Sequence, residues 1–460
     1  MSLDLAIVNG TIVDEHGARS ADLGIHHGKL SVLAPPHTLP AAAETLDARG
    51  LWVLPGIVDA HFHCRAPDSP EREDFMSGTA AAAAGGVTTL FEMPLAHRSV
   101  SSAEVLRERQ ALIERDAYID VSLFAAGGTL DPSATAALAD AGAIGYKIFT
   151  HRAPPGRIAQ FSDLSIFNKQ DLYTALSLIQ KTGLPCAIHA EDDQLLELFA
   201  QQVERSTLTG VDAYLATRPP AVEAMAVAEL AILAEATGAH VHIVHVTSAW
   251  AVDIIRTARK RGAPITAETC PQYLLFDEDT ARRYGPWTKI APPLRTTSDR
   301  EALWAALGDG TLDLIASDHA PFTPADKQNV DLLAAPSGMP NVEVAAPLML
   351  SAALEGKLPI ERMIALLTAN PARVYGVYPQ KGALAVGSDA DVIIYDPHAT
   401  STIDIQSWFS RSKGSARAFD GLSYRGRVLQ TIVRGKTVYR HGQIVGARGA
   451  GELVRPQNRA

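Results

Sequence analysis

Histidine, lysine and aspartate residues stand at the ends of several short apolar runs in this 460-residue chain. The first run, residues 57–61, leads into the sequence Asp59-Ala60-His61-Phe62-His63. Side chains two residues apart on a strand point to the same face, so His61 and His63 can converge on one cation. Paired imidazoles of this kind favour a transition-metal site, with zinc as the first choice.

Four further runs end in residues of the same chemical kind. Lys147 closes the fourth run, His189 the fifth, His245 the sixth and Asp318 the eighth. Each match is weak by itself, because a single lysine or histidine at a strand end is most often a surface or packing residue. Together they place four histidines, one lysine and one aspartate at equivalent positions, which core packing does not explain.

The apolar runs alternate with helical stretches between about residues 52 and 372. Such an alternation, repeated eight times, predicts a (β/α)8 barrel, in which the C-terminal ends of the strands form the rim that carries the chemistry. The expected strands cover residues 57–61, 87–92, 119–125, 143–148, 185–189, 240–246, 264–268 and 312–317.

Both ends of the chain carry short β-rich runs that glycine-containing turns separate. We therefore expect residues 1–52 and 373–460 to form one small β-sandwich subdomain, and residues 53–372 to form the barrel. The predicted fold class is α/β, a TIM barrel with a small β-sandwich subdomain built from both chain ends.

Composition excludes several classes of function. Lys and Arg number 41 and Asp and Glu number 51, so the formal net charge is −10, which disfavours binding to nucleic acid or to an anionic membrane. Three widely spaced cysteines argue against a disulfide framework and for a reducing compartment. The N-terminus lacks a basic segment typical of a signal peptide, and no apolar run reaches the ~20 residues of a membrane span. We expect a cytoplasmic protein with no nucleic-acid or membrane partner.

Lys147 can belong to a metal site only in an uncharged or modified form, because a positively charged lysine would be repelled by neighbouring cations. A neutral Lys147 that has captured CO2 as a carbamate offers two anionic oxygens, which can bridge two divalent metals. Metals held about 3.5–4 Å apart activate the water between them and polarise a carbonyl. Asp318 can then take the proton and pass it to a leaving amide nitrogen. Zinc suits these ligands best, and manganese, cobalt and iron remain possible.

These segments resemble the ligand series of the amidohydrolase superfamily, and the subgroup resembled is the cyclic-amide hydrolases: hydantoinase, dihydropyrimidinase, allantoinase and dihydroorotase. The resemblance spans nearly the whole chain and implies that His61, His63 and Asp318 bind one metal. It implies that His189 and His245 bind the other, with carboxylated Lys147 as the bridge. We choose His245 over His242 because His242 lies deeper in its run. The segments that carry the resemblance are VDAHFH, GYKIF, AIHAE, VHVTS and ASDHAP.

The identity of the ring stays open at this level. The segment Glu92-Met93-Pro94-Leu95 resembles allantoinases, whereas Arg65 resembles the dihydroorotase pattern and suits a carboxylate. Arg152 stands where D-hydantoinases generally carry a tyrosine, and it can bind a ureido or carboxylate group. We therefore expect Arg65, Arg152 and groups near Asn341 to contact the substrate.

The sequence thus predicts a binuclear hydrolase that opens a cyclic amide or ureide, of allantoinase or hydantoinase type, by attack of a hydroxide that bridges the two metals. The alternatives are a dihydroorotase of pyrimidine biosynthesis and, from a different class, a non-catalytic dihydropyrimidinase-like assembly protein. A mononuclear deaminase of the same superfamily would not need Lys147. The resemblance also implies a homodimer or a homotetramer.

Overall fold

The computed structural model describes residues 2–154, 156–328 and 330–457. Eight parallel strands follow one another in chain order in a single sheet, which confirms the predicted barrel. A bridge between Phe62 and His319 joins the segment after the last strand to the first strand, and so nearly closes the sheet. The barrel strands are β8 (Ile57–Phe62), β9 (Val87–Glu92), β10 (Asp120–Ala126), β11 (Gly145–Phe149), β12 (Cys186–His189), β13 (Val241–Ile243), β14 (Ile265–Thr269) and β15 (Leu314–Ile315).

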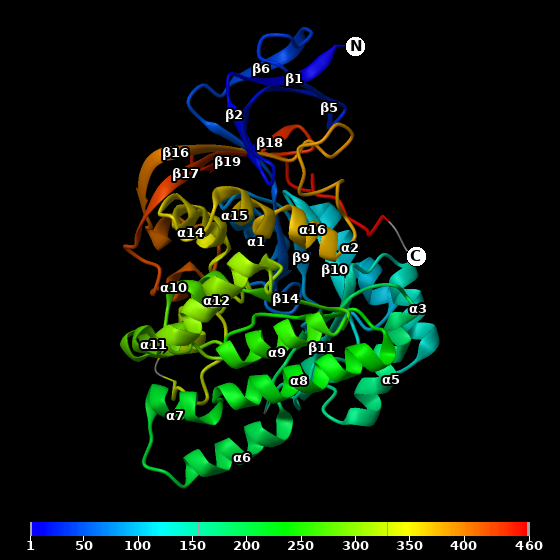
Figure 1. Ribbon diagram of the computed structural model, residues 1–460, viewed down its shortest axis with the longest axis vertical. Helices are drawn as coiled ribbons and strands as arrows, with labels where there is room; N and C mark the ends of the chain where they lie inside the picture. The colour runs from blue at the N-terminus through cyan, green and yellow to red at the C-terminus, as the bar shows by residue number, and fades with distance from the viewer. Residues whose placement is uncertain (1, 155, 329, 458–460) are drawn as a thin grey trace.

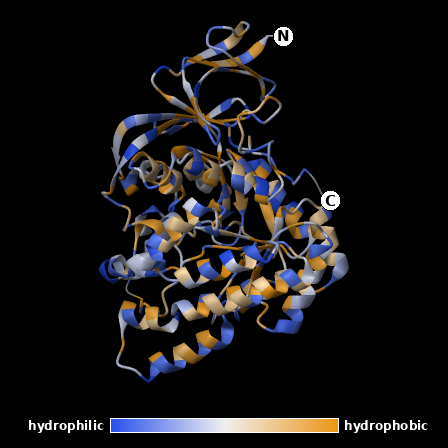
Figure 2. Cartoon of the chain, in the orientation of Figure 1, coloured by the Kyte–Doolittle hydropathy of each residue, from blue (hydrophilic) through white to orange (hydrophobic). Residues whose placement is uncertain are grey.

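Helices surround the barrel and carry both hydrophilic and hydrophobic residues along their length, so that each can turn an apolar face to the core (Figure 2). The main ones are α1 (Phe75–Ala84), α2 (Ala103–Asp116), α3 (Pro132–Asp140), α5 (Lys169–Gln180), α8 (Pro220–Thr237), α9 (Ala249–Lys260), α12 (Thr297–Asp309), α14 (Val342–Leu354), α15 (Ile360–Leu367) and α16 (Ala369–Val374). Shorter or additional helices lie in the loops: α4 (Ile158–Phe161), α6 (Asp193–Glu204), α7 (Gly210–Thr217), α10 (Pro271–Leu275), α11 (Glu278–Tyr284) and α13 (Pro324–Lys327).

The two chain ends build sheets at one end of the molecule (Figure 1). One sheet has the order β5-β4-β1-β6, and the other has the order β19-β18-β17-β16-β7-β2-β3, so strands from both ends pair within it. Strand β7 crosses the domain boundary expected at residue 52, and that boundary stays a prediction. The strands are β1 (Leu3–Val8), β2 (Thr11–Asp14), β3 (Gly17–Ser20), β4 (Asp22–His26), β5 (Lys29–Ala34), β6 (Ala42–Asp47), β7 (Trp52–Pro55), β16 (Val392–Thr402), β17 (Ser423–Val433), β18 (Lys436–Arg440) and β19 (Gln443–Ile444).

Local sequence explains how the first barrel strand is placed. A side chain at Gly56, just before β8, would put its Cβ 2.1 Å from Thr88 Oγ1 on β9, so only glycine allows this approach. Helix α1 begins at a capping box, in which Asp74 accepts a hydrogen bond from the Ser77 backbone amide and the Ser77 hydroxyl accepts one from the Asp74 backbone amide.

Inside the barrel, Tyr375 packs edge to face against Phe91 and Phe124, with ring centroids 5.3 Å apart in each pair. These three aromatic side chains are fully buried and fill part of the barrel interior.

A buried ionic cluster ties the barrel to the end sheets. Lys381 Nζ lies 2.5 Å from Asp120 at the start of β10, and 2.9 Å and 3.0 Å from Asp391 and Asp389 before β16. Arg434 adds a second cation, with its Nη1 2.5 Å from Asp120. Burial would lower the pKa of Lys381, but the three carboxylates outweigh it and raise the pKa above its ordinary value. The lysine is therefore charged and holds the three acids together.

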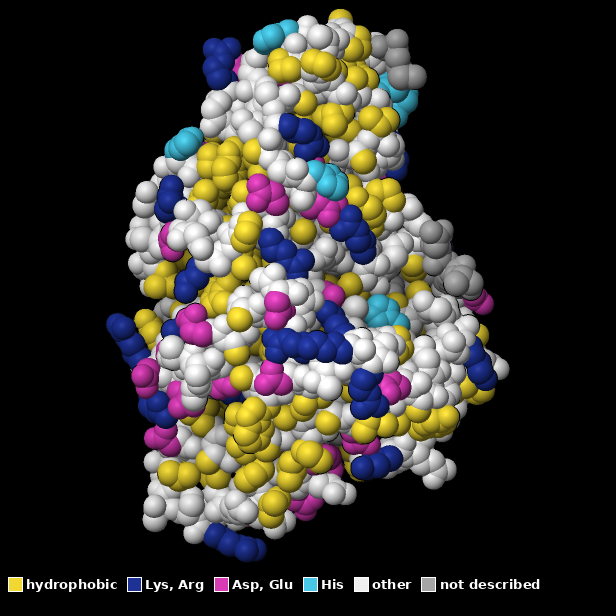
Figure 3. Space-filling model, viewed as in Figure 1, with side chains coloured by type: hydrophobic (Ala, Val, Ile, Leu, Met, Phe, Trp, Pro, Cys, Tyr) yellow, Lys and Arg dark blue, Asp and Glu magenta, His cyan; other side chains and the backbone are white. Residues whose placement is uncertain are grey.

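Two features of the surface bear on possible partners of the chain. Among the described residues, no helix combines the length and the apolar character that crossing a membrane requires. Hydrophobic side chains gather over α7, α8 and α9 on the face that Figure 3 shows. Met225 and Ile232 on α8 and Trp250 on α9 are all more than half exposed. The expected homodimer or homotetramer stays a prediction.

Replacing Lys381 by Met is expected to lower the free energy of unfolding by about 3–5 kcal/mol, because a removed buried cation leaves its carboxylates uncompensated. Urea unfolding followed by tryptophan fluorescence measures the change. The matched control is Lys29→Met. Lys29 Nζ lies 2.6 Å from Asp389, but its side chain is 47% exposed, so its loss should cost less than about 1 kcal/mol. Equal effects of the two substitutions would contradict the buried role of Lys381.

Candidate active site

Three of the expected metal ligands meet at the end of the first barrel strand. His61 lies in β8 and His63 follows it, and their Nε2 atoms lie 3.3 Å and 3.5 Å from Asp318 Oδ1. One ligand atom from each of the three residues lies within 4.8 Å of the others; the two imidazoles are buried, and the Asp318 side chain is 12% exposed. Two nitrogens and one carboxylate oxygen facing one point form a set that suits zinc.

A second pair of imidazoles lies beside this group. His189 ends β12, and its Nδ1 lies 3.0 Å from Nε2 of His245, which stands two residues beyond β13. The expected sixth strand is therefore shorter than its apolar run, and the backbone of His245 turns into the left-handed region at φ 41°. Asp318 also has a positive φ of 46°. Such strain costs on the order of 1–3 kcal/mol and typically marks functional sites.

His242 and His245 differ in their hydrogen bonding, and this difference favours His245 as the metal ligand. His242 Nδ1 lies 2.9 Å from Thr266 Oγ1, and its Nε2 lies 3.2 Å from Glu268 Oε2, so both ring nitrogens have partners. His245 Nδ1, by contrast, is buried with no hydrogen-bond partner in the described parts of the chain. Burial lowers the pKa of His63 and His245 well below 6.5, which keeps both rings in the neutral form that binds metals.

Lys147 on β11 is an amine that interacts electrostatically with both groups, with His63 and Asp318 in the first and with His189 and His245 in the second. Its Nζ is buried, and the described residues provide no hydrogen-bond partner for it. Burial lowers the pKa of Lys147 to about 8, although the carboxylates of Glu268 and Asp318 favour its charged form. An unpartnered buried amine is costly. A carbamate on Lys147 that binds metal ions would remove that cost, so the residues present fit such a metal centre.

Glu268 on β14 orients His61, and the sequence analysis did not assign it this role. Its Oε1 lies 2.6 Å from His61 Nδ1, and both side chains are buried. Burial would raise the pKa of Glu268, but His61 and His242 outweigh it and lower the pKa to about 2. A carboxylate on Nδ1 fixes the tautomer that leaves Nε2 free for a metal. The sequence offered one signal for this role, which is that Glu268 is a carboxylate at the end of the seventh expected strand.

Glu191 and Arg218 do the same for His189. His189 Nε2 lies 2.8 Å from Glu191 Oε2, and Arg218 Nη1 donates a hydrogen bond to the same oxygen. Burial opposes ionisation of Glu191, yet Arg218 and His189 hold its pKa well below the ordinary range. With Nε2 engaged, Nδ1 of His189 is the nitrogen left to face His245 and a metal.

The loop that carries Asp318 is held from both sides. Asp59 accepts hydrogen bonds from the backbone amide and the hydroxyl of Ser317, at 2.9 Å and 2.5 Å. His319 Nδ1 accepts hydrogen bonds from the backbone amides of Asn341 and Val342, at 3.0 Å and 3.2 Å. The His319 ring also stacks on Phe62, so its contacts are those of a structural residue.

The three expected substrate contacts occupy different environments. The Arg65 guanidinium is buried near the first metal group, with its Nε unpartnered among the described residues. Arg152 lies on the rim, where its guanidinium is paired with Asp193 at 2.8 Å and Glu197 at 3.3 Å. Asn341 donates from Nδ2 to Gln272 and to the Ser317 carbonyl, both at 2.8 Å, and its buried Oδ1 has no described partner. Their roles stay predictions.

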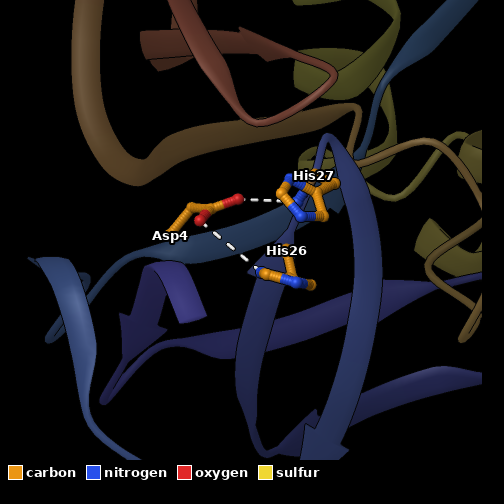
Figure 4. A group of neighbouring side chains, drawn as sticks. All are labelled: Asp4, His26 and His27. Atoms are coloured by element: carbon orange, nitrogen blue, oxygen red, sulfur yellow. Dashed lines mark hydrogen bonds and ion pairs between the residues drawn. The ribbon is translucent and has the colours of Figure 1, made fainter. Parts of the chain in front are cut away.

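Two other groups of side chains have the composition of metal ligands. His151 lies beside His189 and Glu191 at the second pair, with its Nδ1 2.7 Å from the Arg152 carbonyl. Asp4, His26 and His27 lie in the N-terminal sheet, away from the rim (Figure 4). The Asp4 carboxylate there already accepts a hydrogen bond from the His27 backbone amide at 2.6 Å.

Comparisons with known proteins agree with this geometry. A family model described as the amidohydrolase family matches residues 52–438. An allantoinase of Rubrobacter xylanophilus is 36% identical over 99% of this chain and 98% of its own, and a dihydroorotase of Syntrophotalea carbinolica is 35% identical over 95% and 99%. The solved structure of an L-hydantoinase from Arthrobacter aurescens is 30% identical and covers 98% of this chain and 100% of its own, with a TM-score of 0.94.

The Lys147→Ala variant is expected to lose divalent metal, because the oxygens that would join the two ligand groups are gone. Metal content after dialysis, measured by plasma mass spectrometry, tests this. Short carboxylic acids such as acetate should restore part of it. Lys181→Ala, at an exposed lysine after α5, is the control and should bind metal normally. A native metal content in Lys147→Ala would refute the bridging role.

The Arg218→Met variant is expected to weaken binding at the His189 and His245 pair by about 10–100-fold, because the carboxylate that orients His189 loses its counter-ion. Competitive titration with a metal chelator measures the two affinities. The first group, His61, His63 and Asp318, should keep its affinity. Arg205→Met, at an exposed arginine after α6, is the control. Unchanged affinities in Arg218→Met would rule out the orienting role.

Proposed function

The chain belongs to the amidohydrolase family, and from this premise we propose that it is a metal-dependent hydrolase of cyclic amides or ureides, of allantoinase or hydantoinase type. One observation carries the proposal. Lys147 is a buried amine without a described partner that interacts electrostatically with two groups of imidazoles whose ligand atoms face one another. The amidohydrolase family is metal-dependent, and this arrangement supports two ions in this chain, with zinc as the proposed metal.

The first group of residues, His61, His63 and Asp318, would hold one ion, and His189 with His245 would hold the other. A carbamate on Lys147 would join them. Two bound divalent ions would polarise the ring carbonyl and make a water molecule more nucleophilic. Glu268 and Glu191 keep His61 and His189 in the tautomers that this requires.

Asp318 is the residue that would move the proton. Its Oδ1 faces the imidazoles of His61 and His63, so Oδ2 is the oxygen left to accept a proton from the attacking water. Burial raises the pKa of Asp318 above its ordinary value, even though His61 and Lys147 favour the anion. A raised pKa makes the carboxylate a better base and its acid form a donor to the leaving ring nitrogen. Ring opening then yields a carbamoyl acid.

A dihydroorotase is the second candidate, and the buried guanidinium of Arg65 favours it because it suits a substrate carboxylate. A non-catalytic assembly protein is disfavoured, because such a protein has no need of all six ligand residues. We further propose a cytoplasmic homodimer or homotetramer that acts on small molecules.

Parallel measurement of acid release tests the proposed function. Metal-loaded protein is offered allantoin, hydantoin, 5-substituted hydantoins, dihydrouracil and dihydroorotate, and each ring opening creates one carboxylic acid. We expect turnover of allantoin or a hydantoin to exceed that of the other rings. Exclusive turnover of dihydroorotate would favour the second candidate, and no turnover of any ring would contradict both.

The Asp318→Asn variant separates chemistry from metal binding. Its amide keeps an oxygen for the first group but cannot take a proton, so kcat is expected to fall by about 10²–10⁴-fold while metal content stays near native. Steady-state kinetics and metal analysis of the same preparation measure both quantities. A near-native kcat in a fully loaded variant would exclude Asp318 as the general base.

A further inference from the structure

Asp4, His26 and His27 form a compact group on the N-terminal sheet, far along the chain from the rim ligands (Figure 4). Asp4 on β1 and His26 on β4 face each other, because the antiparallel register that pairs Leu5 with Ile25 places them on opposite strands at the same level. His27 follows β4 and begins the turn to β5. One ligand atom from each of the three residues lies within 4.8 Å of the others, so two nitrogens and one carboxylate oxygen surround one point.

The turn brings the two imidazoles to the same side of the sheet. Neighbouring side chains on a strand normally point to opposite faces. His27 and Gly28 are both in the left-handed region, at φ 49° and 72°, and the chain reverses so tightly that His26 pairs with Lys29. The ring centroids of His26 and His27 consequently lie only 3.9 Å apart.

The atoms that face one another in this group are free to bind an ion. Asp4 Oδ2 accepts a hydrogen bond from the His27 backbone amide at 2.6 Å, which fixes the carboxylate and leaves Oδ1. Asp4 Oδ1 lies 3.5 Å from His26 Nδ1, a buried nitrogen with no hydrogen-bond partner in the described parts of the chain. This distance equals that between His63 Nε2 and Asp318 Oδ1 at the rim. Two ligands that each lie about 2.0–2.2 Å from a tetrahedral ion are separated by about 3.3–3.6 Å.

The carboxylate of the group is in the form that binds metals. The hydrogen bond from the His27 backbone amide, together with the charges of the two imidazoles, holds the pKa of Asp4 below its ordinary value. Among the described residues, the one ion-pair partner of Asp4 is His26, so no lysine or arginine competes with a bound cation. Metal ligands must be deprotonated, and Asp4 meets this condition at neutral pH.

A second turn of the same kind shows that the turn alone does not create the group. His441 and Gly442 join β18 to β19, and they too have left-handed backbones, at φ 46° and 85°. In the part of the chain that the structure describes, His441 belongs to no group of three ligand residues. The difference lies in Asp4 and His26, which stand beside the first turn.

We propose that Asp4, His26 and His27 bind one divalent transition-metal ion, with zinc as the first choice, and that this ion joins β1 to the hairpin of β4 and β5. Imidazole and carboxylate ligands suit zinc. The Asp4 side chain is 55% exposed, which leaves room for water as a fourth ligand. The site lies outside the barrel and does not depend on the proposed function.

Calorimetric titration with zinc tests the site in protein whose rim is already loaded and from which free zinc has been removed by dialysis. We expect one further zinc ion to bind per chain. His27→Asn removes one ligand but keeps a residue that favours the left-handed turn, so the fold should persist. It should raise the dissociation constant of this zinc at least about tenfold, the smallest effect typical of losing a residue that only orients a ligand. Asp4→Asn should do the same.

His441→Asn is the matched control, because it makes the same substitution in the other turn and should leave zinc binding unchanged. Anomalous X-ray diffraction of the zinc-containing protein locates the ion, and we expect a peak among the three side chains that His27→Asn removes. The peak should persist in Lys147→Ala, so failure of the rim centre and failure of this site are distinguishable. Absence of a further zinc ion would overturn the proposal. So would a further ion whose affinity is unchanged in both His27→Asn and Asp4→Asn, or one that His441→Asn weakens equally.

Discussion

A buried amine needs a partner, and the rest of this site follows from that constraint. Lys147 lies on barrel strand β11, where burial opposes its charged form and the described residues offer its Nζ no hydrogen-bond acceptor. Imidazoles surround it, and burial keeps those of His63 and His245 neutral. Metal ions held through a carbamate would satisfy the amine and the imidazoles at once. Metal binding at this site would therefore stabilise the folded protein.

Carboxylates that hydrogen-bond to the histidines determine which ring nitrogen of each histidine is left for a metal. Glu268 and Glu191 each engage one ring nitrogen of a histidine, so that the other nitrogen points to the centre. Arg218 keeps Glu191 ionised in spite of its burial. The barrel supplies the common frame, because Glu268, Glu191 and the histidines that they engage stand near or just beyond the C-terminal ends of its strands. At the other end of β10, Asp120 joins Lys381 and fixes the barrel to the end sheets.

Much of this arrangement could be predicted from the sequence, because strand ends can be read from apolar runs that finish in His, Lys or Asp. All eight expected strands are present, and the residues at their ends gather on one rim. The partners of these residues could not be predicted, since Glu268 and His61 lie on different strands and meet only when the barrel closes. The length of β13 and the left-handed backbone of His245 also depend on the tertiary fold. The pairing of Arg152 with Asp193 depends in the same way on how a loop meets α6.

Anomalous X-ray diffraction from crystals grown with zinc and bicarbonate tests the central claim most directly. The account predicts two zinc peaks at the barrel rim, one among His61, His63 and Asp318 and one between His189 and His245. Electron density on Lys147 Nζ should connect them. A single rim peak, with Lys147 unmodified in a protein that still opens its ring substrate at full rate, would contradict the binuclear centre.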